Sequence, residues 1–298
     1  MNILITGGTG LIGKILVEKL KLKGHEVRVL TRKKTADPLE FYWNLKDQFI
    51  NESAFKNLDA IIHLAGASIS ERWTDSYKKE LFSSRIDTAN LLKIYCIANN
   101  VHLKSFISAS GINYYGTFTS DEILDENSGI VQPDFLANLC KDWENAAYNF
   151  ADLSDRIVCL RTAVVLAKNS GAFPLLKKTV DFNIGSGVGT GNQWMNWIHI
   201  DDLVDLYIFA LENSKIQGNF NAVADDLPSN QLFMKKLAKV CRKFFLPINV
   251  PAFVLKLAFG EMSSIILEGT RASNKKIKSQ GFDFKHNTIE KAFKNLIE

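Results

Sequence analysis

Cysteine and histidine are both scarce in this sequence, and neither is spaced as a cross-link or a metal site would require. The four cysteines, Cys96, Cys140, Cys159 and Cys241, lie far apart and form no C-x-x-C motif. Disulfide frameworks are typical of much shorter secreted chains, so these residues are predicted to be reduced thiols of a cytosolic protein. The five histidines form no H-x-x-x-H pair, and the sequence therefore predicts no metal site.

Long apolar runs and a large excess of either charge are also missing. The most membrane-like segment begins at Val250, but Lys256 and Glu261 interrupt it before it reaches the roughly 20 apolar residues that a bilayer crossing needs. We expect one or two helices packed on the protein itself. A net charge of +4 on 298 residues does not predict binding to a nucleic acid. No basic leader precedes the first apolar run, so we expect a cytoplasmic protein with neither a nucleic-acid nor a membrane partner.

Short apolar runs alternate with longer helical patterns over the first two-thirds of the chain. The runs lack an in-and-out alternation, which is typical of parallel strands buried on both faces. Right-handed crossovers between such strands give an α/β fold with a Rossmann-type, doubly wound sheet. A continuous helical pattern covers Asp75 to about Asn99. The predicted strands are residues 2–6, 26–30, 59–65, 105–109 and 156–161.

The alternation weakens after Leu166, and this change sets the predicted domain boundaries. We expect a nucleotide-binding Rossmann domain over residues 1–225, with segment 167–197 contributing to a substrate lobe. A smaller, mostly helical module follows over residues 226–298.

The glycine-rich loop from Gly185 to Trp194 is a candidate lid over a substrate. Trp197 is expected to be buried between the two lobes. His199 precedes two aspartates and is expected to cap a helix rather than to act in catalysis.

The chain begins with a glycine motif in the context that dinucleotide binding requires. ILITGGTGLIG places Gly7, Gly8, Gly10 and Gly13 between an apolar strand and a helix. Glycine is needed here because the turn takes positive φ, and because a Cβ would keep the backbone away from a pyrophosphate. The helix N-terminus then directs its free N–H groups at the phosphates.

The second strand indicates which dinucleotide is bound. NAD sites usually place an acid at the end of this strand to hold the ribose hydroxyls. Here the strand ends in Arg32, Lys33 and Lys34 without an acid. Because a guanidinium suits a 2′-phosphate, the sequence favours NADP(H) as the cofactor. The alternative is a basic turn that only faces solvent.

Several motifs, taken in order, resemble those of extended short-chain dehydrogenase/reductases: TGGTGLIG, DAIIHLAGA, FISASGINYYG, LRTAVVL and WIHIDDLV. RWTDSYKKELFSSRIDT, DFLANLCKDWE and GTGNQWMNWIHIDDL are similar, more narrowly, to the atypical NAD-dependent epimerase/dehydratase-like family. The stretch from about Val250 resembles that family's own C-terminal module, so the resemblance covers nearly the whole chain.

The resemblance implies a role for each matching residue. The pyrophosphate would lie on the glycine loop, the 2′-phosphate on Arg32, and the adenosine side of the cofactor near the third strand. Ser108 and Ser110 fall on the strand that usually carries the active-site hydroxyl, and Arg161 and Thr162 begin the segment that passes the nicotinamide. The remaining implied cofactor residues are Gly7, Thr9, Gly10, Leu11, Ile12, Gly13, Leu64, Ala65 and Gly66.

One element of the family's chemistry is absent. Extended members carry Tyr-x-x-x-Lys on the helix after the serine strand, where the lysine lowers the tyrosine pKa and the tyrosine exchanges a proton with the substrate. In this chain those positions are Leu136 and Cys140. The only Tyr-x-x-x-Lys, Tyr42 to Lys46, lies between the second and third strands and is interpreted as a coincidence.

Two hypotheses follow for the missing pair. In the first, Tyr115 donates a proton to a carbonyl held by Ser110, and the chain is an NADP-dependent oxidoreductase or epimerase acting on a small polar substrate. The alternative for Tyr115 is an aromatic anchor that packs a loop. Lys141 and Glu144 are expected to be surface charges that support their helix.

In the second hypothesis the chain binds NADP(H) without turnover, as a regulator or scaffold. The sequence also leaves the oligomeric state open. The helix at 75–99 would suit a homodimer, and packing of that helix on its own sheet would give the same pattern.

Overall fold

The computed structural model describes all 298 residues and is built around one eight-stranded sheet. The strand order is β12-β8-β6-β5-β1-β2-β3-β4, and every neighbouring pair is parallel except β3 and β4. The parallel sheet predicted from the sequence is therefore confirmed. Its strands are β1 (Asn2–Thr6), β2 (Glu26–Thr31), β3 (Glu40–Asn44), β4 (Phe49–Ile50), β5 (Ala60–His63), β6 (Ser105–Gly111), β8 (Ile157–Thr162) and β12 (Gly218–Ala222).

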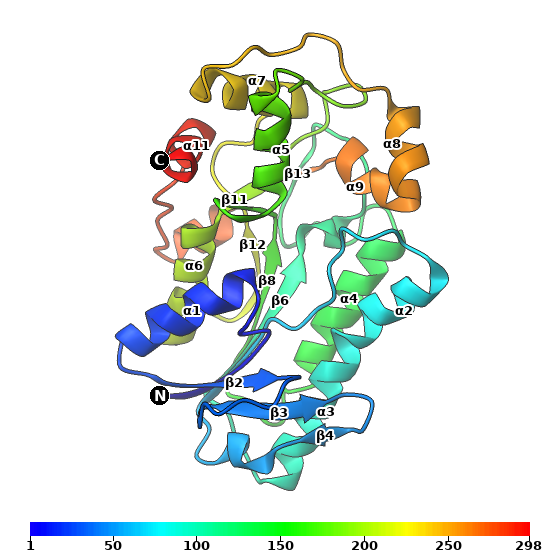
Figure 1. Cartoon of the computed structure of the whole chain (residues 1–298). Coiled ribbons are helices and arrows are strands. Elements are labelled where there is room, and N and C mark those ends of the chain that lie inside the picture. The colour runs from blue at the N-terminus through cyan, green and yellow to red at the C-terminus, as the bar shows by residue number, and fades with distance from the viewer.

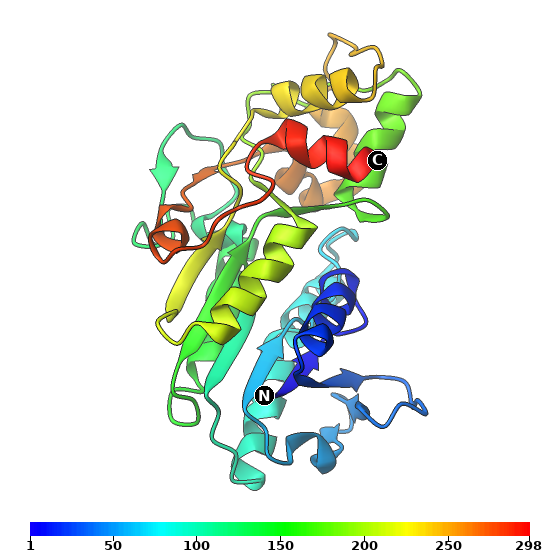
Figure 2. The same cartoon turned by 90° about the vertical axis from the view of Figure 1, so that its left-hand side faces the viewer.

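Helices cover both faces of the sheet, as a doubly wound fold requires (Figures 1 and 2). On one face α1 (Leu11–Leu22) and α6 (Ile200–Glu212) enclose a core of 32 buried residues. On the other face α3 (Ile86–Ala98) and α4 (Phe135–Tyr148) close a second core of 18. Because both faces are buried, the strands need apolar residues at successive positions, which explains the runs seen in the sequence.

A largely helical C-terminal lobe lies above the carboxyl ends of the strands (Figure 1). Its own core contains Phe173, Phe233 and Phe293, together with Trp197. No helix in the molecule is both long and apolar enough to cross a bilayer. The elements in and around the lobe are β9 (Val164–Ala167), β10 (Ser170–Gly171), α5 (Ala172–Asp181), β11 (Trp197–His199), α7 (Asn230–Val240), α8 (Ala252–Phe259), η3 (Gly260–Ser263), α9 (Ser264–Leu267), β13 (Arg271–Ala272), α10 (Lys275–Ser279) and α11 (Ile289–Ile297).

The helix expected over residues 75–99 is in fact two helices, α2 (Asp75–Ser83) and α3. The break is at Arg85, whose side chain is buried. Its guanidinium donates to the carbonyl oxygens of Ala67 at 2.9 Å and Leu81 at 3.0 Å. These bonds tie the last turn of α2 to the loop after β5 and turn the chain into α3. The remaining short elements are η1 (Glu52–Phe55), η2 (Ile112–Tyr115) and β7 (Ile123–Leu124).

The segment from Val250 departs in part from its prediction as helices packed on the protein. Met262 and the following turn do pack against α2 and α4. In contrast, α8 has no buried residue, and both Phe253 and Leu257 on it are exposed. The apolar composition of α8 is therefore not explained by the core of this chain.

Candidate functional site

The glycine loop between β1 and α1 has no room for side chains at its key positions. Gly7 has φ +69°, and a Cβ there would lie 2.8 Å from the carbonyl carbon of Leu64. A Cβ on Gly13 would lie 2.2 Å from the carbonyl oxygen of Gly7. The N–H of Gly10 donates to that same oxygen at 2.9 Å and closes the turn. The loop therefore brings α1 against the carboxyl ends of β1 and β5, and β1 is where the strand order reverses.

The N-terminus of α1 also lacks a side-chain cap. Gly10 is its N-cap residue and supplies no side-chain hydrogen bond. In α2, α4 and α7 the corresponding residues are Thr74, Asp134 and Ser229, and each accepts a hydrogen bond from a backbone N–H of its helix. The N–H groups of the first turn of α1 thus stay free for an anion, which the helix dipole also favours.

A buried threonine and histidine hold the loop after β5 in place. Thr6 accepts hydrogen bonds from the N–H groups of Leu64 at 3.1 Å and Ala65 at 3.0 Å, and its hydroxyl lies 2.8 Å from Nδ1 of His63. The Nε2 atom of His63 lies 3.0 Å from the carbonyl oxygen of Arg85 and donates to it. Burial lowers the pKa of His63 to about 4, so the ring is neutral. This network fixes Leu64, Ala65 and Gly66 beside the glycine loop.

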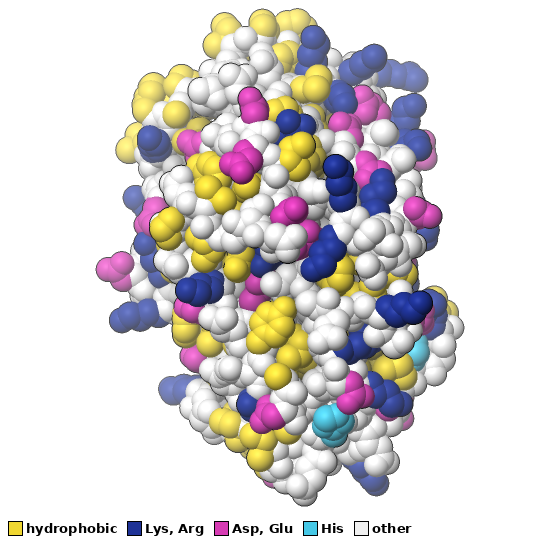
Figure 3. All heavy atoms as spheres, turned by 180° about the vertical axis from the view of Figure 1, so that it is seen from behind, with side chains coloured by type: hydrophobic (Ala, Val, Ile, Leu, Met, Phe, Trp, Pro, Cys, Tyr) yellow, Lys and Arg dark blue, Asp and Glu magenta, His cyan; other side chains and the backbone are white.

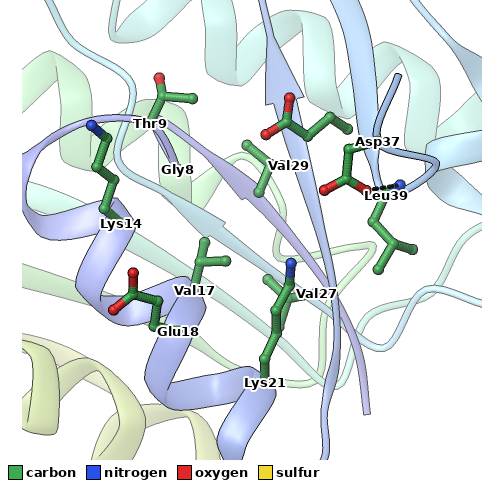
Figure 4. A pocket seen from close by; sticks show the side chains of 11 residues that line it. Gly8, Thr9, Lys14, Val17, Glu18, Lys21, Val27, Val29, Asp37 and Leu39 are labelled. Carbon is green, nitrogen blue, oxygen red and sulfur yellow. Dashed lines mark hydrogen bonds between the residues drawn. The ribbon is translucent and has the colours of Figure 1, made fainter. Parts of the chain in front are cut away.

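Arg32 lies just beyond β2 and is exposed, like Lys33 and Lys34. Below the loop, a cleft of about 270 Å³ separates α1 from β2 and the chain leading to β3 (Figure 4). Lys14, Glu18 and Lys21 line it from α1, and Val27 and Val29 form its apolar wall on β2. Arg32 is not among the residues that line this cleft.

The serine strand leads into a closed polar cluster instead of an open site. Glu144 accepts hydrogen bonds from Ser110 at 2.8 Å, from Nε of Arg161 at 2.8 Å and from Nη2 of Arg161 at 2.9 Å. Asn219 adds a further bond at 3.1 Å. The exposed fraction is 1% for Arg161 and 3% for both Ser110 and Glu144. The expectation that Glu144 is a surface charge is therefore wrong, because its carboxylate forms a buried ion pair.

Tyr115 belongs to the same cluster and is fully buried. Its hydroxyl donates to Oδ1 of Asn221 at 2.8 Å and accepts from Nη1 of Arg161 at 3.2 Å. Burial raises the pKa of Tyr115 to about 12, against the opposing effect of Arg161. With both sides of the hydroxyl engaged, the geometry favours an aromatic anchor over a proton donor that reaches a substrate.

The other residues predicted near the nicotinamide also have internal partners. The hydroxyl of Ser108 is buried and donates to the carbonyl oxygen of Ala109 at 2.9 Å. Thr162 is half-buried and donates to the carbonyl oxygen of Leu160 at 3.1 Å. Thr9 and Gly10 are exposed, whereas Leu11 and Ile12 are half-buried at the start of α1.

The positions of the absent Tyr-x-x-x-Lys pair lie in apolar surroundings. Leu136 packs in a hydrophobic cluster with Trp73 from the loop before α2 and Met262 from the C-terminal module. Cys140 is buried next to Gly111, where a Cβ would lie 3.0 Å from its sulfur. Burial raises the pKa of the Cys140 thiol to about 12, so the thiol stays protonated at neutral pH. Neither residue is placed to transfer a proton.

The glycine-rich loop predicted as a lid is bonded to the C-terminal lobe. Gln193 is buried and donates to the carbonyl oxygens of Val188 at 3.1 Å and Ile266 at 3.0 Å. Nε1 of Trp194 donates to Asp121 at 3.1 Å. Trp197 is buried, but it lies in the core of the C-terminal lobe and not between the two lobes as predicted. These bonds favour a fixed segment over a mobile lid.

His199 confirms the helix-cap prediction, since its Nδ1 accepts the N–H of Asp201 at 3.1 Å. The fold also brings His286 close to this pair, a proximity that the scattered sequence positions did not suggest. The two imidazole rings stack with centroids 3.7 Å apart and 26° between their planes. The potential ligand atoms of His199, Asp201 and His286 lie within 4.8 Å of one another, a grouping that the prediction of no metal site did not anticipate.

Two family models match the chain: the NAD dependent epimerase/dehydratase family over residues 3–222, and a domain of unknown function, DUF1731, over residues 250–296. Among its relatives, epimerase family protein YfhF of Bacillus subtilis is 35% identical over 302 residues, which cover 100% of this chain and 98% of YfhF. The chloroplastic epimerase family protein SDR39U1 homolog of Arabidopsis thaliana is 34% identical, covering 100% of this chain and 87% of the homolog.

Solved structures agree with these sequence matches. Human epimerase family protein SDR39U1 with NADPH superimposes with a TM-score of 0.89 at 29% identity and covers 99% of each chain. The nucleoside-diphosphate sugar epimerase from Corynebacterium glutamicum gives 0.79 at 31% identity, covering 97% of this chain and 56% of that chain. The glycine loop, the sheet order and the matched residues 3–222 lead to one assignment: this chain belongs to the NAD dependent epimerase/dehydratase family.

Proposed function

We propose that the chain binds NADP(H) on the β1–α1 loop and acts as an oxidoreductase or epimerase-like protein on a small polar carbonyl or hydroxyl substrate. The observation that carries this proposal is the uncapped N-terminus of α1 beside glycines that leave no space for a Cβ. That geometry fits a pyrophosphate. The NADPH bound to human SDR39U1 adds support, since the two chains match over 99% of their length.

The residues around the loop fit the rest of such a cofactor. Leu64 and Ala65, which are held by Thr6, and the adjacent Gly66 would lie along its adenosine side. The exposed guanidinium of Arg32 would hold the 2′-phosphate by charge-assisted hydrogen bonds. A bound nicotinamide supplies hydride transfer, and the protein's part is to bind it, orient it and exclude water.

Replacing Arg32 with alanine tests the assignment of the cofactor. Loss of hydrogen bonds between charged groups costs about 1.5–3 kcal/mol, so the Kd for NADPH should rise roughly 10- to 100-fold. NADH has no 2′-phosphate, and its Kd should change by less than about twofold. Titration of the cofactor fluorescence measures both constants. Lys56→Ala removes an exposed cation distant in sequence and serves as the control. Equal weakening of NADPH and NADH by Arg32→Ala would contradict the assignment.

A catalytically silent NADP(H)-binding regulator is the second candidate, and one observation favours it. The positions of the family's proton donor and its lysine partner are Leu136 and Cys140, both buried. The hydroxyls of Ser110 and Tyr115 are both engaged within the protein. Deleting a general acid lowers a rate by about 10² to 10⁴ and leaves slow hydride chemistry. The rate of NADPH oxidation with a panel of carbonyl and nucleotide-sugar compounds separates the two candidates. Measurable turnover supports the enzyme, whereas no oxidation with any compound supports the regulator.

The variant Tyr115→Phe distinguishes an anchor from a proton donor. If Tyr115 is an anchor, removing its hydroxyl leaves Asn221 and Arg161 each without one hydrogen-bond partner. The free energy of unfolding should then fall by about 1–3 kcal/mol. The Kd for NADPH and any turnover per folded molecule should stay unchanged. Urea denaturation and NADPH titration measure these quantities. A sharp loss of turnover with unchanged stability would restore Tyr115 as the donor.

A further inference from the structure

The C-terminal lobe ends in a group of large apolar side chains that no part of the chain covers. We name this group the apolar tip, and its members are 60% to 81% exposed. Single exposed apolar residues are ordinary, but a contiguous set usually marks an interaction surface. The tip consists of Phe182, Ile184, Phe244, Ile248, Phe253 and Leu257.

Backbone hydrogen bonds join the two segments that carry four of the six tip residues, Phe182, Ile184, Phe244 and Ile248. Two segments, 182–189 and 244–250, run side by side. The N–H of Leu246 donates to Gly185, and the N–H of Val250 donates to Gly187, each at 2.9 Å. Helix α8, which carries Phe253 and Leu257, begins only two residues after Val250. The tip is thus a preformed surface on the folded lobe.

The segments that carry the tip are strongly basic. Segments 170–190 and 230–259 contain eight lysines and arginines but only one acid, Asp181. The rest of the chain carries more acidic than basic residues, so its whole positive excess lies here. Figure 3 shows hydrophobic side chains along the top and upper left of the end that bears this lobe, and several basic side chains at its upper right. Six of the cations are exposed and form no ion pair: Lys178, Lys235, Lys239, Arg242, Lys243 and Lys256.

We propose that the apolar tip docks this protein on the surface of an anionic phospholipid bilayer. Apolar side chains would enter the boundary between headgroups and acyl chains while the surrounding cations meet lipid phosphates. A second copy of the chain fits less well, because pairing two tips would bring two positively charged segments of the lobe together. Docking of this kind needs no membrane-spanning helix and revises the sequence-based expectation of no membrane partner.

Co-sedimentation of the full chain with vesicles tests the proposal without NADP(H), so its outcome is independent of the proposed function. The protein should sediment with phosphatidylcholine vesicles that contain about 30 mol% phosphatidylglycerol, and at least about tenfold less with pure phosphatidylcholine. Raising NaCl from about 0.1 M to about 1 M shortens the Debye length from about 10 Å to about 3 Å and should release it. Both measurements, with vesicles of different composition and with NaCl, use the unaltered chain, so they do not depend on whether a variant folds.

Two variants then locate the contact. Phe253→Glu combined with Leu257→Glu should weaken binding to the anionic vesicles at least about tenfold, because it removes apolar contact and adds negative charge. The matched control is Leu22→Glu at the end of α1, which is 88% exposed and outside the tip. This control should bind like the unaltered chain. Thermal unfolding curves confirm that both variants are folded.

Three results would overturn the proposal. The first is no sedimentation with anionic vesicles, and the second is an equal loss of binding in Leu22→Glu and in the tip variant. The third is a dimer, seen by analytical ultracentrifugation, that the tip variant dissociates while vesicles bind neither form. In that case a second copy of the chain covers the tip.

Discussion

Glu144→Ala should lower the free energy of unfolding by about 3–5 kcal/mol, as is typical when one partner of a buried ion pair is removed. The substitution leaves the Arg161 guanidinium, which is 1% exposed, without its carboxylate. Ser110 and Asn219 lose their acceptor as well. Urea denaturation at neutral pH measures the change.

Two controls separate the ion pair from general effects of charge removal. Asp181→Ala breaks an exposed pair with Lys177 on α5 and should cost less than about 0.5 kcal/mol. Arg161→Met in the Glu144→Ala background removes the unpaired cation and should recover part of the lost stability. A loss below about 1 kcal/mol for Glu144→Ala would show that water reaches the cluster, contrary to the structure.

Acid should destabilise the protein through two buried histidines. Burial lowers the pKa of both His63 and His199 to about 4, from an ordinary value of 6.5. Between pH 6.5 and pH 4 the unfolded chain binds protons at these positions and the folded chain does not. The free energy of unfolding therefore falls as the pH drops through this window, by up to roughly 3 kcal/mol for each histidine. Above pH 6.5 the two residues contribute no pH dependence.

The variant His199→Asn tests this acid response at one of the two positions. Asparagine still caps a helix but does not titrate, so the histidine-dependent slope of stability against pH should fall by about half. His102→Asn provides the comparison, because the side chain of His102 is 62% exposed. Unfolding free energies measured between pH 7.5 and pH 4.5 give the slopes. An unchanged slope in His199→Asn would assign the acid response to other groups.

Features set by nearby residues could be predicted from the sequence. The strands follow from apolar runs, and the geometry of the phosphate loop follows from the steric needs of Gly7, Gly10 and Gly13. The capping role of Asp134 is also local, since its carboxylate accepts the N–H of Ala137 three residues later. In each case the interacting atoms lie within one turn or one strand of each other.

Features that depend on distant residues could not be predicted in the same way. The break between α2 and α3 depends on Arg85 reaching the carbonyl of Ala67 in another loop. The burial of Glu144 depends on Arg161, which lies on a strand beyond the helix. One signal was present, because Glu144 shares the apolar face of α4 with Cys140 and Ala147 at helical spacing. A charge on an apolar stripe indicates a buried partner, but not which one.

Residues 272–284 complete the core that packs against the first strand. Ala272, Ile277, Phe282 and Phe284 belong to the same core cluster as Ile3 on the first strand. Although domains usually fold in turn as they leave the ribosome, this sheet cannot complete its packing until residues 272–284 have been synthesised. A chain that stops before Ala272 would lack these four of the 32 buried side chains in that core, and the face of the sheet that carries Ile3 would stay partly uncovered.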